Sequence, residues 1–157
     1  MATEIERKFL IKDNRWRENA TGTLYRQGYI PTKNGTTVRV RLVGNQGYLT
    51  IKGLSVGFSR AEYEYPIPAE DAQEMLDKLC DRPLIEKTRY KIDVAGLIWE
   101  VDEFAGENQG LIMAEVELTD EEHSVELPEW IGEEVTDDSR YYNVNLAKNP
   151  FSQWVKQ

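Results

Sequence analysis

Histidine and cysteine are almost absent from this chain of 157 residues. Cys80 is the only cysteine, so no disulfide can form within the chain. His123 is the only histidine, and it lies in the acidic stretch 120–124. Ordinary zinc sites need several cysteine or histidine ligands, and histidine-dependent triads need a histidine base. The sequence therefore argues against both kinds of site.

Long apolar runs and an excess of positive charge are also missing. No stretch approaches the length of a membrane-spanning helix, and the N-terminus has neither an apolar run nor a cleavage-site pattern. The formal net charge is -9, whereas a nonspecific binder of nucleic acid or anionic membranes is normally basic. We therefore expect a cytoplasmic protein that binds neither nucleic acid nor a membrane. The sequence leaves a homodimer open.

The length fits one domain over residues 1–157, because two ordinary domains would need a longer chain. Alternation of polar and apolar residues dominates and predicts a mainly β fold of class α+β. Eight strands are expected, in segments 4–11, 24–30, 37–43, 48–52, 59–67, 84–94, 97–104 and 111–118. Helical spacing is found in 69–80 and in a second segment that follows a cap at 136–138 and stops at Pro150.

Charged residues on these strands come in pairs of one sign, two positions apart. The acidic pairs are Glu4 with Glu6, Glu62 with Glu64, Glu100 with Asp102, and Glu115 with Glu117. The basic pairs are Arg39 with Arg41 and Lys87 with Arg89, and Lys8 and Lys52 stand alone on their faces. An ordinary wet face mixes small polar residues with both signs, and like charges at this spacing repel slightly. The repeated pattern therefore favours a functional face.

Eight antiparallel strands can close a barrel, in which inner and outer residues alternate along each strand. One closure buries the apolar faces and leaves the charges in water. The other turns the charges inward and covers the apolar outer faces with helices, such as 69–80 and the C-terminal one. A charged lumen is costly when dry and unpaired, but water, metal and a polyanion would make it a site. Carboxylate ligands without histidine or thiolate point to Mg²⁺ or Mn²⁺.

The ordered set of charged motifs resembles the CYTH superfamily, also called triphosphate tunnel metalloenzymes, and in particular its small bacterial-type inorganic triphosphatases. The motifs are E-x-E-x-K from Glu4, R-x-R from Arg39, Lys52, E-x-E from Glu62, K-x-R from Lys87, Asp102 and E-x-E from Glu115. The resemblance runs from Glu4 to about Ala147. It implies a single CYTH-like domain, built as a closed eight-stranded antiparallel β-barrel tunnel with a charged lumen and peripheral helices.

The resemblance also implies roles for the charged residues. The basic ones would hold a triphosphate: Lys8, Arg39, Arg41, Lys52, Lys87, Arg89 and, from the C-terminal helix, Arg140. The acidic ones would hold Mg²⁺ or Mn²⁺: Glu4, Glu6, Glu62, Glu64, Asp102, Glu115 and Glu117. Of these, Glu62, Glu64 and Asp102 could equally serve only to orient the basic residues. Either Lys8 or Lys87 could help to deprotonate the attacking water, and the sequence does not choose between them.

Several functions fit such a site. Metal-dependent hydrolysis of inorganic tripolyphosphate to pyrophosphate and phosphate is the first expectation, because the chain is compact and has no recognisable insertion to read a base. A class IV adenylyl cyclase and a thiamine triphosphatase are the enzymatic alternatives. A polyphosphate or nucleotide sensor is the nonenzymatic alternative, although carboxylate pairs would not help an anion binder.

Overall fold

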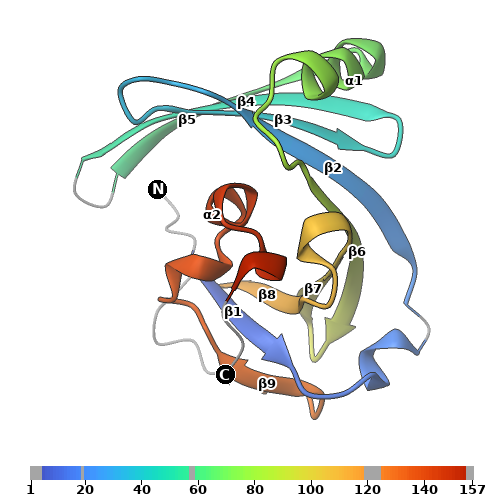
Figure 1. Ribbon diagram of the computed structural model, residues 1–157. Helices are drawn as coiled ribbons and strands as arrows, with labels where there is room; N and C mark the ends of the chain where they lie inside the picture. Colours follow the sequence, from blue (N-terminus) through green and yellow to red (C-terminus); the bar gives the residue numbers. More distant parts are fainter. Residues whose placement is uncertain (1–4, 19, 57–58, 119–124, 155–157) are drawn as a thin grey trace.

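The computed structural model describes residues 5–18, 20–56, 59–118 and 125–154, and its strands form one nine-stranded antiparallel sheet in the order β5-β4-β3-β2-β6-β7-β8-β1-β9 (Figure 1). The strands are β1 (Ile5–Ile11), β2 (Gly22–Ile30), β3 (Thr37–Val43), β4 (Gln46–Val56), β5 (Ser59–Ile67), β6 (Ile85–Val94), β7 (Leu97–Phe104), β8 (Ile112–Leu118) and β9 (Ile131–Glu134). The helices are α1 (Ala69–Lys78) and α2 (Asn143–Lys148), with single 3-10 turns η1 (Arg15–Arg17), η2 (Gly106–Asn108), η3 (Ser139–Tyr141) and η4 (Phe151–Gln153).

The mainly β antiparallel fold and all eight predicted strands are confirmed, and β9 adds a ninth strand to the sheet. The strongly curved sheet has β5 and β9 as its edges, and no ladder joins them among the described residues (Figure 1). The predicted antiparallel tunnel is therefore confirmed as one curved antiparallel sheet, with one strand more than expected and no pairing between its edge strands in the described residues. The ninth strand forms because β1 pairs with β8 along one edge and with β9 along the other, at Phe9 and Ile11.

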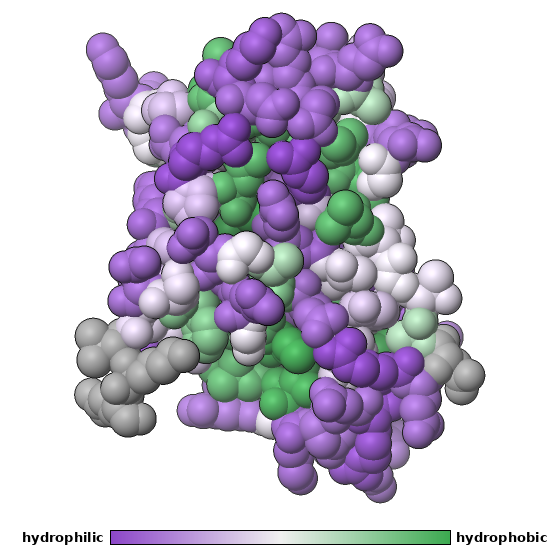
Figure 2. Space-filling model, turned by 45° about the vertical axis from the view of Figure 1, so that its right-hand side comes forward, coloured by the Kyte–Doolittle hydropathy of each residue, from purple (hydrophilic) through white to green (hydrophobic). Residues whose placement is uncertain are grey.

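The outer face of the sheet is apolar, as the alternation requires. Helix α1 covers β3 and β4, where Ala72 and Leu76 pack with Val40 in a buried cluster. This approach is close, because a Cβ atom at Gly47 would lie 2.9 Å from the Cβ of Ala72. Hydrophilic side chains of α1 face solvent at the top of Figure 2, with hydrophobic surface beneath them. The predicted role of this helix as an outer cover is confirmed.

A second buried cluster covers the outer face of β1, β7 and β8. Trp99 lies at its centre, with ring centroids 5.5 Å from Phe9 and 6.0 Å from Trp130. Trp16, in the 3-10 turn after β1, closes the same cluster. These apolar contacts hold the charged residues of the same strands on the opposite, concave face.

The C-terminal segment packs on the concave face, not on the outside. Leu146 and Ala147 of α2 join Ile85, Phe104 and Met113 in a buried cluster at one end of the strands. The predicted outer-cover role of this helix is therefore wrong. The single predicted helix is also broken, because Tyr142 has an extended backbone with φ -73° and ψ 137° between η3 and α2. One end of the concave face is thus closed by apolar packing.

Among the described residues, neither α1 nor α2 has the length and apolar character of a membrane-spanning segment.

Shortening Leu76 should destabilise the fold, because its side chain is fully buried between α1 and the sheet. Leu76→Ala should lower the free energy of unfolding by about 2–5 kcal/mol, measured by urea denaturation. The matched control is Leu79→Ala, because Leu79 at the end of the same helix is 54% exposed. The control should change stability by less than about 0.5 kcal/mol. Equal losses in the two variants would contradict the packing described here.

Candidate functional site

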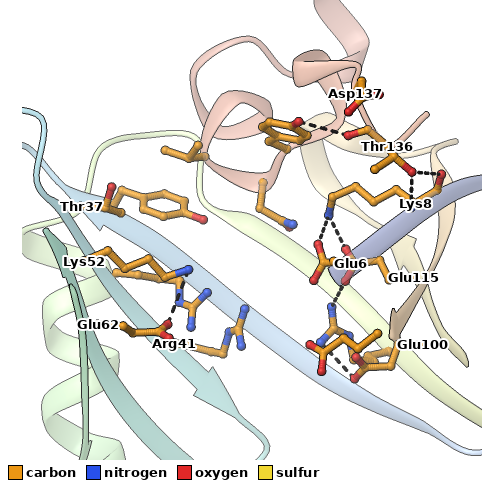
Figure 3. Close-up of a pocket in the computed structure, with 17 residues that line it drawn as sticks. Glu6, Lys8, Thr37, Arg41, Lys52, Glu62, Glu100, Glu115, Thr136 and Asp137 are labelled. Carbon is orange, nitrogen blue, oxygen red and sulfur yellow. Dashed lines mark hydrogen bonds and ion pairs between the residues drawn. The ribbon is translucent and has the colours of Figure 1, made fainter. Parts of the chain in front are cut away.

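A cavity of about 550 Å³ lies on the concave face of the sheet (Figure 3). Two groups of charged side chains face each other across it. One group comes from β3, β4 and β5, and the other from β1, β6, β7 and β8. The lining residues are Glu6, Lys8, Tyr29, Thr37, Arg39, Arg41, Lys52, Glu62, Arg89, Glu100, Glu115, Glu117, Thr136, Asp137, Tyr142, Asn143 and Val144.

The first wall is built by the pairing of β1 with β8. The register places Glu6 opposite Glu117 and Lys8 opposite Glu115, so all four side chains project from the same face. The Nζ atom of Lys8 lies 2.7 Å from Oε1 of Glu115 and 2.9 Å from Oε1 of Glu6. Burial disfavours the charged form of Lys8, but Glu115 and Glu6 outweigh it and raise the pKa of this lysine. Lys8 therefore stays protonated and positively charged between the two carboxylates.

Asp102, on β7, forms ion pairs with Lys87 and Arg89 of the neighbouring strand β6. Its Oδ1 accepts a hydrogen bond from Nε of Arg89 at 2.7 Å, and its Oδ2 accepts one from Nη2 at 2.8 Å. The same Oδ2 lies 2.9 Å from Nζ of Lys87. Burial would raise the pKa of Asp102, but the charges of Lys87 and Arg89 prevail and lower it to about 2. The carboxylate is therefore shared between two cations.

Lys87 lies behind the cavity instead of lining it. Its side chain has no solvent exposure, and Nζ donates a hydrogen bond to Oδ1 of Asn143 at 3.1 Å. Burial lowers the pKa of Lys87 to about 8, because Asp102 is shared with Arg89 and offsets only part of the cost. Asn143 is the first residue of α2, so this hydrogen bond connects the start of the helix to β6 of the sheet.

The second wall, from β3 to β5, carries its positive charges with looser partners. Lys52 lies 3.6 Å from Glu62, and Arg39 lies 3.9 Å from Glu64. The Nε atom of Arg39 is buried and has no hydrogen-bond partner. Burial, followed by repulsion from Arg39 and Arg89, lowers the pKa of Arg41 to about 10. This wall therefore has positive charge that the protein itself does not fully neutralise.

The structure brings together most of the residues that the sequence predicted for the site. The residues that line the cavity are Glu6, Lys8, Arg39, Arg41, Lys52, Glu62, Arg89, Glu115 and Glu117. Lys87 and Asp102 lie directly behind them, and Glu64 lies on β5 without lining the cavity. Glu4 lies outside the described residues. Glu6 and Glu117 are exposed, while Glu115 is buried.

Arg140 is not brought to the cavity. Its guanidinium lies 2.6 Å from the carboxylate of Asp138 and stacks over the ring of Trp154, with 5.0 Å from Cζ to the ring centroid. In this structure Arg140 therefore does not make the predicted contact from the C-terminal helix into the tunnel. The reason is local, because Arg140 lies in η3, where Asp138 caps the turn and holds the arginine two residues later.

Several site residues carried no clear sequence signal. On β2, Gln27 bonds to both Arg41 and Tyr29, but uncharged residues did not stand out among the charged pairs. Thr136, Asp137 and Asn143 come from the segment after β9, and that strand was itself not predicted. Glu100 was recognised in the sequence as the partner of Asp102 in an acidic pair but was given no site role, and the structure places it at the cavity.

Carboxylates on the first wall are the groups that could hold a hard divalent cation. Glu6, Glu115 and Glu117 share the concave face, and carboxylate oxygens are the ligands that Mg²⁺ prefers. Within the described residues, no three acidic side chains already surround one point. Lys8 occupies the space between Glu6 and Glu115, so a cation there would have to share or replace its ion pairs. The donor set fits such an ion in its chemistry.

Comparison with known proteins gives consistent matches over almost the whole chain. An inorganic triphosphatase of Acetivibrio thermocellus is 53% identical over 154 residues, covering 98% of this chain and 99% of that protein. One of Nitrosomonas europaea is 40% identical over 149 residues, covering 92% and 97%. A crystal structure of an inorganic triphosphatase superposes with a TM-score of 0.74 at 35% identity, covering 94% of this chain and 95% of that one.

The family described as the CYTH domain matches residues 2–148. This range includes every charged motif from Glu4 to Glu117 that suggested the resemblance. The resemblance predicted from the order of those motifs is therefore confirmed, and the chain belongs to the CYTH domain family.

Proposed function

We propose that this protein hydrolyses short triphosphates, with inorganic tripolyphosphate converted to pyrophosphate and phosphate. The observation that carries the proposal is a single cavity in which Arg41 and Lys52 face the carboxylates of β1 and β8 (Figure 3), with Arg39 lining the same cavity. Phosphoryl transfer needs charge neutralisation and alignment more than covalent chemistry, and this cavity offers both. Two relatives named inorganic triphosphatase, at 53% and 40% identity, support the same substrate class.

The cations divide into two groups by how firmly the protein holds them. Arg89 and Lys8 have carboxylate oxygens within 2.7 Å, so they are already neutralised and fixed. Arg39, Arg41 and Lys52 have no carboxylate closer than 3.6 Å among the described residues. A triphosphate can therefore gain most from this second group, with the arginines gripping oxygens in pairs.

Mg²⁺ or Mn²⁺ completes the proposed reaction. Glu6, Glu115 and Glu117 would hold the ion, with Glu4 of the same motif as a further candidate from the sequence. Bound there, the ion would neutralise phosphate charge and activate the attacking water. Asp102 is better suited to hold Lys87 and Arg89, because its two oxygens already take three close contacts from them. Glu62 and Glu64 lie near Lys52 and Arg39, which supports an orienting role.

The two lysines considered as bases differ in this structure. Lys8 has a raised pKa and two carboxylate partners, which suits a clamp for phosphate or for the carboxylates. Lys87 has a pKa lowered to about 8, which suits a base at mildly alkaline pH. Because its ammonium is enclosed behind Asp102 and Asn143, a base role for Lys87 stays a prediction.

The cavity favours a bare triphosphate over a nucleotide. A cyclase must also recognise adenine, which usually requires an apolar slot. Among the described lining residues, Tyr29, Tyr142 and Val144 offer the main apolar surface. The hydroxyl of Tyr142 is already bonded to the carbonyl of Thr136, and its ring faces Lys8 at 5.9 Å. These features support tripolyphosphate as the first substrate to test.

The purified protein should release phosphate from tripolyphosphate when Mg²⁺ or Mn²⁺ is present. ATP and thiamine triphosphate, assayed in parallel, should be hydrolysed more slowly, and ATP should give no cyclic AMP. Chelation of the metal should abolish turnover, and added metal should restore it. Tight binding of tripolyphosphate without hydrolysis would instead support a sensor, and cyclic AMP formation would support a cyclase.

Glu6→Gln and Arg41→Ala should affect the reaction differently. Glu6→Gln removes a metal-binding charge with little change of shape, so metal-supported kcat should fall about tenfold or more. Arg41→Ala should mainly raise KM, because Arg41 would contact phosphate in both the ground state and the transition state. Steady-state kinetics at saturating metal separates the two effects. Parent values of kcat for Glu6→Gln would remove this residue from the proposed metal site.

Asp102→Asn should destabilise the fold more than an ordinary surface change. It leaves Lys87 and Arg89 buried without their shared anion, which should cost about 3–5 kcal/mol at pH 7. The folded pKa of about 2 lies below the ordinary 3.8, so the wild type holds this contribution above pH 4 and loses it as pH falls toward 2. Urea titrations should therefore show the gap between wild type and variant shrinking by about 2 kcal/mol over that range. A gap independent of pH would contradict the assigned ion pairs.

A further inference from the structure

Gln27 is a buried amide at the centre of the charged concave face. Its side chain has no solvent exposure, and the sheet register places it opposite Arg41 on β3 and Ile85 on β6. Buried amides are almost always hydrogen-bonded at both ends. Here the two ends reach Arg41 and Tyr29, which both line the cavity. Gln27 itself does not line it.

The chemistry of arginine fixes the orientation of this amide. The Nε of Arg41 can only donate a hydrogen bond, so the group 2.9 Å away must be the oxygen Oε1 of Gln27. The nitrogen Nε2 then faces the hydroxyl of Tyr29 and donates to it at 3.1 Å. Because the Tyr29 oxygen accepts this bond, its own hydrogen is left to be donated to another group. The cavity that Tyr29 lines is where a phosphate oxygen would receive it.

The neutrality of Gln27 matters as much as its position. Arg89 is oriented by the carboxylate of Asp102, which also cancels its charge. Arg41 forms no ion pair with a carboxylate in the described part of the chain, and Gln27 is its hydrogen-bond partner there. An amide fixes the plane of the guanidinium through Nε and leaves its two terminal nitrogens and its full charge for an anion.

We propose that Gln27 is a positioning residue that directs both the guanidinium of Arg41 and the hydroxyl of Tyr29 toward the phosphate groups of the substrate. The inference rests on the proposed triphosphatase function and adds to it a residue that does not touch the substrate. Gln27 holds two donors from adjacent strands in one geometry, so both reach the anion already oriented. Its contribution falls on substrate binding and not on the metal.

The first test is Gln27→Met, which keeps the length of the side chain and removes both hydrogen bonds. KM for tripolyphosphate should rise about tenfold, while kcat changes less than about threefold. The matched control is Gln46→Met, because Gln46 is exposed at the start of β4 and lies outside the cavity. This control should keep the parent KM. An unchanged KM in a folded Gln27→Met protein would overturn the inference.

A background variant separates positioning from general structural damage. In protein that carries Arg41→Ala and Tyr29→Phe, the added change Gln27→Met should weaken tripolyphosphate binding less than about twofold, because both groups it positions are gone. Calorimetry of tripolyphosphate without added metal measures this directly. An undiminished effect in that background would show that Gln27 acts through the fold alone and would overturn the inference.

A second variant covers the case in which Gln27→Met fails to fold. Gln27→Glu keeps an acceptor for Arg41 but neutralises it and cannot donate to Tyr29, so the affinity for tripolyphosphate should fall about tenfold or more. Parent affinity in this variant would refute the proposal.

Measuring binding apart from hydrolysis also separates the positioning role of Gln27 from the proposed triphosphatase function. If the wild type binds tripolyphosphate but does not hydrolyse it, the triphosphatase function fails while the affinities of the Gln27 variants still decide the positioning role.

Discussion

The paired contacts of Asp102 with Lys87 and Arg89 stabilise the charged face of the sheet more than any other interaction there. Two buried or nearly buried cations, Lys87 and Arg89, converge on the Asp102 carboxylate within 2.9 Å. Without that anion their mutual repulsion and loss of hydration would oppose folding. With it, Arg89 is fixed at the cavity and Lys87 is fixed to Asn143 of α2. A single side chain thus joins the sheet, the cavity and the C-terminal helix.

The apolar outer face makes this arrangement possible. Strand alternation puts Val101 on the opposite side of β7 from Asp102, and Val116 on the opposite side of β8 from Glu115 and Glu117. Packing around Trp99, together with the cover that α1 gives to β3 and β4, supplies the hydrophobic stabilisation that a charged face cannot. Burial of apolar surface on the outer face therefore offsets the unfavourable free energy of gathering charges on the concave face.

The charges on the two walls of the cavity are neutralised to different extents. This difference makes one wall suited to an anion and the other to a cation. The wall of β1 and β8 is internally paired through Lys8, while the wall of β3 to β5 keeps Arg41 oriented by neutral Gln27. The positive charge of the second wall therefore favours binding of an anion. The first wall favours binding of a cation, because its three carboxylates, Glu6, Glu115 and Glu117, outnumber Lys8. The triphosphate and the divalent metal of the proposed reaction would match both needs. The apolar cluster of α2 with Ile85 and Met113 closes one end of this space.

Alternation along each strand was sufficient to predict which face of the strand carries the charges. Period-two spacing was enough to place Arg39 with Arg41 and Glu115 with Glu117 on common faces, and the order of the motifs was enough to identify the family. Which charges neutralise one another depends on how the strands meet in three dimensions, and the order of the motifs does not contain this information. Arg140 turned to Asp138 because a local cap competes with any distant contact, and β9 formed because β1 offered it an edge. Gln27 gained its role from strand register, which brings it beside Arg41 across 14 positions of sequence. Such pairings depend on distances between strands, and spacing along one strand does not contain them.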